Sequence, residues 1–196
     1  WGVAGAAELQ DLPVWGRGGA RGAELVRLPD GALDGQPVTR GLWASTDAPT
    51  MPELEHETWR WLEAASGVPR IVAATVEQFV PQMVNLELVG GVDFQKGCYP
   101  GQEVVARSQY RGTLKRRAFV VICEAPLHPG QDVFHAEDAD QPAGMVVLAG
   151  SHGGRHNALV ELKIAATADA SALHAGSVGG PGLTLVDLPY SIPTAE

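Results

Sequence analysis

The sequence predicts an α+β fold in two parts, an α+β domain over residues 1–111 and a small antiparallel β-barrel over residues 112–196. The first part has a helical pattern at residues 53–65 among short β-prone runs. The second part consists of short β-prone runs broken by Gly, Pro and Asp clusters, which is typical of a small barrel or sandwich. A chain of 196 residues with 45% hydrophobic and 19% charged residues can bury such a core.

The first part opens with glycine-rich sequence. Residues 1–23 predict a mobile loop rather than an RNA-binding arm, because two arginines among glycines are more typical of a loop. Residues 24–28 and 38–44 are β-prone and predict two short strands. The Pro-Asp-Gly sequence at residues 29–31 predicts the turn between them.

A helix is predicted for residues 53–65. Acidic residues crowd its first turns, where they suit the positive end of the helix dipole, and Gly67 with Pro69 ends it. Trp59 lies outside the face that the helix is expected to turn toward the core. Five residues at helical spacing form that face: Leu54, Thr58, Trp61, Leu62 and Ala65.

Residues 76–88 predict a turn followed by a helix or an extended crossover. The amides of Gln82 and Asn85 in this stretch can match the donor and acceptor edge of a ligand, or they can cap turns. A structural role is favoured for Asn85, and both roles stay open for Gln82. For Trp59, outside the inward face of the helix, a ligand contact and a second packing role likewise stay open.

Five β-prone runs predict the strands of the second part. Cys123 ends the first of these runs and is expected in the core. The runs are residues 117–123, 132–134, 143–149, 158–164 and 183–186.

The net charge of −9 argues against a general nucleic-acid or membrane-surface binder, because such proteins need basic faces. Residues 96–117 are the exception, with six Lys and Arg residues against Glu103, a net charge of +5. Cys98 and Cys123 form no CxxC pair, and no apolar run reaches the roughly 20 residues that span a bilayer. We therefore expect reduced thiols and a cytoplasmic protein without membrane contact.

The stretch from Gly90 to Gly112 places Cys98 beside a predicted tight turn. Gly97 and Gly101 allow backbone conformations closed to other residues, and the proline between Tyr99 and Gly101 fixes one φ angle. Neighbouring cations favour the thiolate, the form that attacks electrophiles and binds metals. Cys98 is therefore either a presented, reactive thiol or a small buried hydrophobe, as free cysteines usually are.

One run carries a family resemblance: Lys96-Gly97-Cys98-Tyr99-Pro100-Gly101-Gln102-Glu103, with Val105-Ala106-Arg107 behind it and residues 79–86 in front. It resembles the signature of the YgfZ-type folate-binding proteins, which are relatives of the glycine-cleavage aminomethyltransferase (T-protein). The resemblance covers residues 59–117 and, more loosely, the ending at residues 188–190. Proteins of this family are longer at the amino end, and Trp1 stands where an initiator Met would be, so we expect a carboxy-terminal portion of a T-protein-like fold.

By this resemblance, the chain binds a tetrahydrofolate and supports the assembly or repair of iron-sulfur proteins, including enzymes that modify tRNA. Cys98 is then the reactive thiol and Lys96 the residue that activates it. Iron-sulfur proteins are transient partners, and neither a metal site in the chain nor direct tRNA binding is expected. The resemblance implies six folate-contacting residues, Trp59 by stacking: Trp59, Gln82, Tyr99, Gln102, Glu103 and Arg107.

One departure from the family pattern concerns the pterin. The family carries Glu-Ala-Gly-x-Pro where this chain has Ala65-Ser66-Gly67-Val68-Pro69, and Glu63 lies about half a turn away from the missing carboxylate. The catalytic aspartate of the transferases has no counterpart that we can place, so whether the chain is an enzyme stays open. Two alternatives remain: a folate-dependent aminomethyl or methyl transferase, and a non-enzymatic interaction module that uses the basic residues 96–117.

Two other patterns do not support a site. Ser151 and Ser177 each miss the nucleophile-elbow pattern by an alanine, and neither sits between a strand and a helix. His152 and His156 are four residues apart, but the two glycines between them make a helix unfavourable, and a zinc site would need further ligands.

Overall fold

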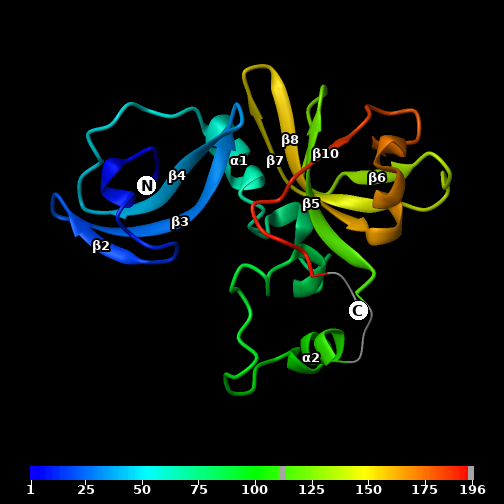
Figure 1. Ribbon diagram of the computed structural model, residues 1–196, viewed down its shortest axis with the longest axis horizontal. Coiled ribbons are helices and arrows are strands. Elements are labelled where there is room, and N and C mark those ends of the chain that lie inside the picture. The colour runs from blue at the N-terminus through cyan, green and yellow to red at the C-terminus, as the bar shows by residue number, and fades with distance from the viewer. Residues whose placement is uncertain (111–113, 194–196) are drawn as a thin grey trace.

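The computed structural model describes residues 1–110 and 114–193. In these residues the chain forms two antiparallel sheets with a helix between them (Figure 1). The first sheet, in the order β1-β4-β3-β2, contains β1 (Gly2–Ala4), β2 (Arg17–Ala20), β3 (Ala23–Leu33) and β4 (Gln36–Ala44). The second sheet, in the order β10-β5-β8-β7-β6-β9, contains β5 (Arg116–Cys123), β6 (Asp132–His135), β7 (Gly144–His152), β8 (Arg155–Lys163), β9 (Leu173–Ala175) and β10 (Thr184–Val186).

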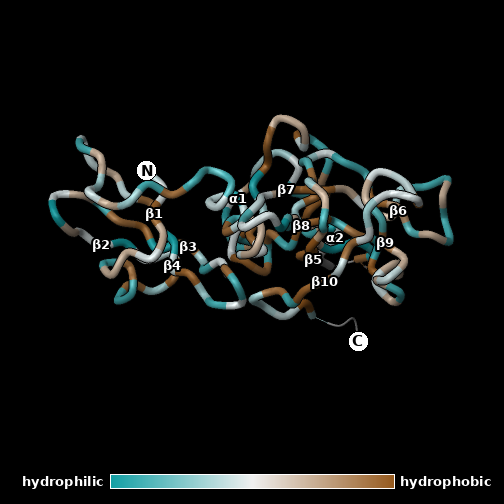
Figure 2. The backbone as a smooth tube through the Cα atoms, turned by 90° about the horizontal axis from the view of Figure 1, so that it is seen from above, coloured by the Kyte–Doolittle hydropathy of each residue, from teal (hydrophilic) through white to brown (hydrophobic). Residues whose placement is uncertain are grey.

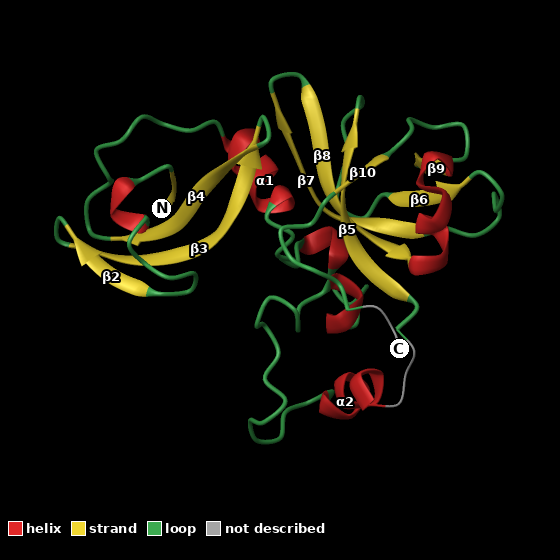
Figure 3. Ribbon diagram, viewed as in Figure 1, coloured by secondary structure: helices red, strands yellow, loops and turns green. Residues whose placement is uncertain are grey.

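The helices are short (Figure 3). Within the described residues, the α-helices are α1 (His56–Ala65) and α2 (Gln102–Tyr110). Short 3-10 segments connect the other elements: η1 (Ala7–Leu9), η2 (Ala73–Thr75), η3 (Pro81–Val84) and η4 (Ile164–Ala172). No helix in residues 1–110 and 114–193 has the length and apolarity needed to cross a membrane.

The first sheet differs from the prediction in two places. Residues 1–23 were predicted to be a loop, but they form β1, η1 and β2, because Val3 and Leu9 are buried beside Trp43 of β4. The hairpin between β3 and β4 turns at Asp34 and Gly35 rather than at residues 29–31. Both turn residues have positive φ, as a type I′ hairpin requires, and the predicted turn is instead an irregularity in the pairing.

Helix α1 packs between the two sheets, as the view from above shows (Figure 2). It begins at His56, three residues later than predicted, so Leu54 lies outside the helix and stays exposed. The predicted inward residues Thr58, Trp61 and Leu62 are buried. The indole of Trp61 donates to the carbonyl of Ala32 in β3 at 2.8 Å, which ties the helix to the first sheet.

The second sheet is curled into a half barrel and buries apolar residues on both faces. Successive side chains of β5 point to opposite faces of the sheet. Val121 and Cys123 belong to one core cluster, and Ala118 and Val120 belong to the other. The N–H of Leu183 donates to the carbonyl of Leu173 at 2.9 Å, which brings the ends of the sheet together. The cluster under the curl is Val121, Cys123, Leu127, Val133, Ala143, Val146, Ala158, Val160, Leu162, Leu173, Ala175 and Leu183.

The strands predicted after Gly112 are confirmed as β5, β6, β7, β8 and β10, and the structure adds β9 and η4. Cys123 is buried, as predicted. Residues 76–88 form the short η3 in place of a longer helix or an extended crossover. The predicted boundary between the two parts, at residues 111 and 112, lies outside the described residues.

Candidate functional site

Cys98 is exposed and directly precedes a tight turn. The N–H of Gln102 donates to the carbonyl of Tyr99 at 3.2 Å, with Pro100 and Gly101 at the central positions. Gly101 has a φ of 79°, the left-handed value that a type II turn requires there. The predicted turn is therefore confirmed, and the sequence forms it locally, because proline fixes the first central position and glycine permits the second.

Residues 90–110, here called the arm, carry this turn and then α2. Figure 1 shows the arm leaving the body of the two sheets, with the loop that precedes α2 reaching farthest from them. On α2, Val105 is buried, whereas Glu103, Val104 and Arg107 are exposed. The arm therefore presents most of its first helical turns to solvent.

Lys96 contacts the aromatic ring next to the cysteine. Its ammonium nitrogen lies 4.8 Å from the centroid of the Tyr99 ring, within the range of a cation–π interaction. This contact links the two residues on either side of Gly97 and Cys98, which restricts the loop that carries the thiol. Activation of Cys98 by Lys96 stays a prediction.

Gln82 holds the arm on the body. Its side chain is fully buried, and Nε2 donates to the carbonyl of Val105 in α2 at 2.8 Å. Its Oε1 is buried without a hydrogen-bond partner among residues 1–110 and 114–193. Sequence reasoning left this amide between a ligand contact and a structural role. The structure gives it a structural contact, and its contact with folate stays a prediction.

A buried polar network fixes η3 beneath the arm. The guanidinium of Arg117 donates to the carbonyl of Gln82 at 3.0 Å and pairs with the carboxylate of Glu87. The amide of Asn85 donates to the carbonyl of Ala118 at 2.8 Å and to the hydroxyl of Tyr190 at 3.2 Å. These bonds join η3 to β5 and to the carboxy-terminal segment, so the anchor of the arm is itself rigidly held.

Trp59 lies on the first sheet, apart from the arm. A Cβ added to Gly2 would lie 2.8 Å from its ring, and the guanidinium carbon of Arg40 lies 5.4 Å from the ring centroid. Burial lowers the pKa of Arg40 to about 10, so it remains a cation at neutral pH. Figure 1 shows α1, which carries Trp59, well separated from α2. The structure thus does not bring Trp59 and the arm together.

The basic patch predicted for residues 96–117 exposes fewer cationic side chains than the charge count suggests. Arg116 forms two hydrogen bonds with the buried carboxylate of Glu161, at 2.7 and 2.8 Å, and Arg117 is buried against Glu87. Burial raises the pKa of Glu161, and the neighbouring Arg116 acts in the opposite direction. Arg111 lies outside the described residues. Two of the six cations therefore stabilise the fold rather than face a partner.

A pocket of about 420 Å³ lies at the base of the arm. Leu88 and Val89, which directly precede the arm, form one wall. The loop before β2, strand β3, the segment after α1 and the carboxy-terminal segment form the others. None of the predicted site residues lines it. Sequence reasoning missed this pocket because its lining comes from separate segments, and the one local signal was Trp15 within glycine-rich sequence.

Ser151, His152 and His156 lie on the β7–β8 hairpin, whereas Ser177 follows β9. Ser151 Oγ is 2.8 Å from Nδ1 of His156, its direct cross-strand partner, and His152 Nδ1 is 3.0 Å from Oγ1 of Thr58. His152 and His156 lie at the ends of β7 and β8, on strands rather than in the helix that the sequence argued against or in a glycine-rich loop. No group of three or more His, Cys, Asp or Glu residues suited to a metal ion occurs in the part of the chain that the structure describes.

Part of the chain is similar to a known protein. No protein-family model matches the chain. Over 71 residues the chain is 48% identical to the tRNA-modifying protein YgfZ of Photobacterium profundum. The match covers 36% of this chain and 22% of that protein, so the shared stretch spans less than a quarter of the relative.

Proposed function

Since the chain belongs to the YgfZ family, we propose that it is part of a folate-binding protein with a T-protein-like fold that supports tRNA modification in the cytoplasm. The protein binds a tetrahydrofolate and assists the assembly or repair of iron-sulfur enzymes, among them enzymes that modify tRNA. Cys98 is its reactive thiol. The role is that of an accessory protein rather than of an aminomethyltransferase.

The observation that carries this proposal is the exposure of Cys98 beside the turn of the arm. Free cysteines are usually buried, as Cys123 is, because the thiol behaves as a small hydrophobe. An exposed sulfur on an extended arm can reach an iron atom or an electrophile of another protein without any unfolding. The position of Cys98 therefore suits a thiol that acts on a partner.

The neighbours of the thiol suit the same role. Lys96 and Tyr99 contact each other across it, and Glu103 and Arg107 lie four residues apart on the exposed side of α2. In this proposal Lys96 favours the thiolate, and the polar residues of α2 contact the folate or the partner. Trp59 and Gln82 belong to the folate contacts that the family resemblance implies.

The test of the thiol uses two single-cysteine variants of the full-length protein, Cys98→Ala and Cys123→Ala. Each replaces the only copy in cells, and the fraction of modified tRNA nucleosides is measured by mass spectrometry. We expect Cys98→Ala to lower this fraction and Cys123→Ala to leave it unchanged, because only Cys98 is exposed. Wild-type levels in Cys98→Ala would remove the thiol from the proposal.

The folate part is tested separately. Calorimetric titration of the full-length protein with tetrahydrofolate is expected to show binding, and its absence would overturn this part. Turnover of methylene-tetrahydrofolate with an amine donor would instead identify the protein as a transferase.

A further inference from the structure

The pocket at the base of the arm points to the place where the folate ring binds, an inference that rests on the proposed folate binding. We propose that this pocket takes a flat heterocycle with a 2-amino-4-oxopyrimidine edge, held between the indole of Trp15 and the carboxylate of Asp30. Pterins and guanine share this edge. For this chain the occupant is the pterin of a folate.

Trp15 has an unusual backbone for a large aromatic residue. Its φ is 66°, in the left-handed region that bulky side chains rarely adopt, and such conformations concentrate at ligand sites. The N–H of Trp15 donates to the carbonyl of Arg27 at 2.8 Å, and the N–H of Arg27 donates back to the carbonyl of Gly16 at 2.9 Å. These bonds hold the conformation in place.

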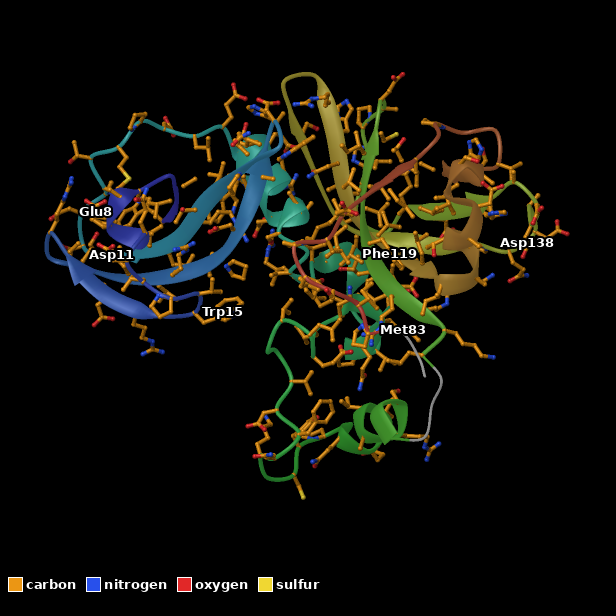
Figure 4. The ribbon with its side chains drawn as sticks, in the orientation of Figure 1. Glu8, Asp11, Trp15, Met83, Phe119 and Asp138 are labelled. Atoms are coloured by element: carbon orange, nitrogen blue, oxygen red, sulfur yellow. The ribbon has the colours of Figure 1, made fainter. Side chains whose placement is uncertain are left out.

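The indole of Trp15 is available for stacking. Its exposed fraction is 49%, which is high for a tryptophan that lines a pocket. Figure 4 shows Trp15 at the lower rim of the first sheet, on the side from which the arm extends. An aromatic side chain in this position offers a flat apolar wall, and flat heterocycles stack on such walls.

Asp30 supplies the polar contact. Its Oδ1 accepts a hydrogen bond from the guanidinium of Arg27 at 2.7 Å, and its side chain remains 37% exposed. The bond from Arg27 uses Oδ1 and leaves Oδ2 of this partly exposed carboxylate to face the pocket in our proposal. A carboxylate offers about four acceptor sites, so Asp30 can still accept two adjacent N–H groups.

The charges around Asp30 favour a neutral ligand over a cation. Arg27 pairs with Asp30 directly, and Arg40 lies close enough to interact with it electrostatically. These guanidinium groups offset the carboxylate, while their own side chains are largely buried and out of reach of an anion. A neutral ring with adjacent N–H donors satisfies Asp30 without adding charge.

The other polar groups of the pocket are already used by the fold. The hydroxyl of Ser66 donates to the carbonyl of Glu63 at 2.7 Å, and the hydroxyl of Tyr190 donates to the carbonyl of Gly67 at 2.6 Å. The remaining lining is largely apolar, with Val68 as an example. The pocket therefore selects a ligand that has a flat apolar face and one edge rich in hydrogen-bond donors. Its volume lies in the usual range for small-molecule sites.

Trp59 is the tryptophan that the family resemblance assigns to stacking. Its ring is packed against Gly2 and lies beside the guanidinium of Arg40. The structure therefore favours Trp15 over Trp59 as the stacking residue. Because Leu88 and Val89 line the same pocket, a bound ring would also touch the segment that leads into the arm.

The experiment measures dissociation constants of tetrahydrofolate and of guanosine by calorimetry, with the full-length protein. Trp15→Ala is expected to weaken tetrahydrofolate binding about tenfold or more, because stacking on an aromatic side chain contributes on this scale. Asp30→Asn replaces an acceptor by a donor and is expected to have a similar effect. Asp34→Asn is the matched control, since Asp34 also pairs with an arginine but lies outside the pocket.

A second measurement uses only the wild-type protein, in case Asp30→Asn disturbs the fold. Pterin and lumazine differ in that lumazine carries an oxo group in place of the 2-amino group. The pocket is expected to bind pterin about tenfold or more tightly than lumazine, because Asp30 then faces an oxygen instead of a donor. Equal affinity for the two rings would overturn the assignment of Asp30.

The outcomes separate this inference from the proposed function. If tetrahydrofolate binds and only Trp59→Ala weakens it, the pocket assignment is overturned and folate binding stands. If guanosine binds through Trp15 and Asp30 and tetrahydrofolate does not, the pocket chemistry stands and the folate proposal is overturned. Absence of binding by both ligands overturns both.

Discussion

Replacing Gln82 by leucine is expected to loosen the arm and leave the body folded. The two side chains are similar in size, so the buried site stays filled. The substitution removes the hydrogen bond from Nε2 to the carbonyl of Val105, which is the side-chain bond that ties α2 to η3. The backbone carbonyl of Gln82 keeps its bond from Arg117, so the network beneath the arm remains.

The magnitude follows from the geometry. A hydrogen bond of this kind contributes about 0.5–1.5 kcal/mol net, so its loss raises the equilibrium constant for opening of α2 about two- to thirteen-fold. The substitution also removes Oε1 of Gln82, a buried acceptor without a partner in the described residues. Relief of that desolvation offsets the lost bond, so the free energy of global unfolding should change by no more than about 1 kcal/mol.

The assay is hydrogen exchange read by mass spectrometry. Peptides that cover residues 102–110 should exchange faster in Gln82→Leu by the factor given above, while peptides from β7 and β8 should be unchanged. Gln78→Leu is the control, because Gln78 is an exposed glutamine whose amide donates to the nearby carbonyl of Val76. Unchanged exchange of α2 in Gln82→Leu would refute the anchoring role of Gln82.

Two further predictions concern the body. Gly150→Ala should lower the free energy of unfolding, measured in denaturant, by about 1–3 kcal/mol, because the new Cβ would collide with the backbone nitrogen of Trp61 in α1. Gly182→Ala is the control and should leave this free energy unchanged, because its Cβ would meet no atom within 4 Å. Burial raises the pKa of Tyr190, so its stabilising contribution is present below the ordinary tyrosine pKa of about 10 and is lost as the pH rises through the raised value. Absorbance titration should therefore show one phenolate step at a pH above the ordinary tyrosine pKa, and Tyr190→Phe should remove this step. Identical titration curves for the wild type and Tyr190→Phe in that pH range would contradict the prediction.

The turn beside Cys98 could be predicted because its causes are adjacent in the sequence. Pro100 and Gly101 set the two central φ angles of a type II turn, and no distant residue is needed. The hairpin of the first sheet could not be placed as easily, because two Asp-Gly pairs lie within six residues. Gly31 belongs to the pair that does not turn, and a Cβ there would lie 2.9 Å from a methyl group of Leu62 in α1. Glycine at position 31 therefore allows α1 to pack closely against β3.

The polar site residues were harder to predict because their partners are distant in the sequence. Gln82 bonds to Val105, and Trp59 packs against Gly2 and Arg40. Composition shows that such residues can bind a ligand, but it does not show which of them the fold uses. The charge count over residues 96–117 overestimated the basic surface for the same reason, since the carboxylates that pair with two of its arginines lie outside that window.

The attachment of the arm suits a thiol that acts on another protein. A site that works inside one chain gains from many packing contacts, because these fix the reacting groups within fractions of an ångström. Helix α2 of the arm combines the two situations: Val105 is buried and its carbonyl accepts a bond from Gln82, whereas Val104 beside it is exposed. Such an arm can adjust to a partner's surface without disturbing either sheet. Because Leu88 and Val89 line the pocket and lead directly into the arm, a ligand in the pocket would contact a segment through which the position of Cys98 can respond.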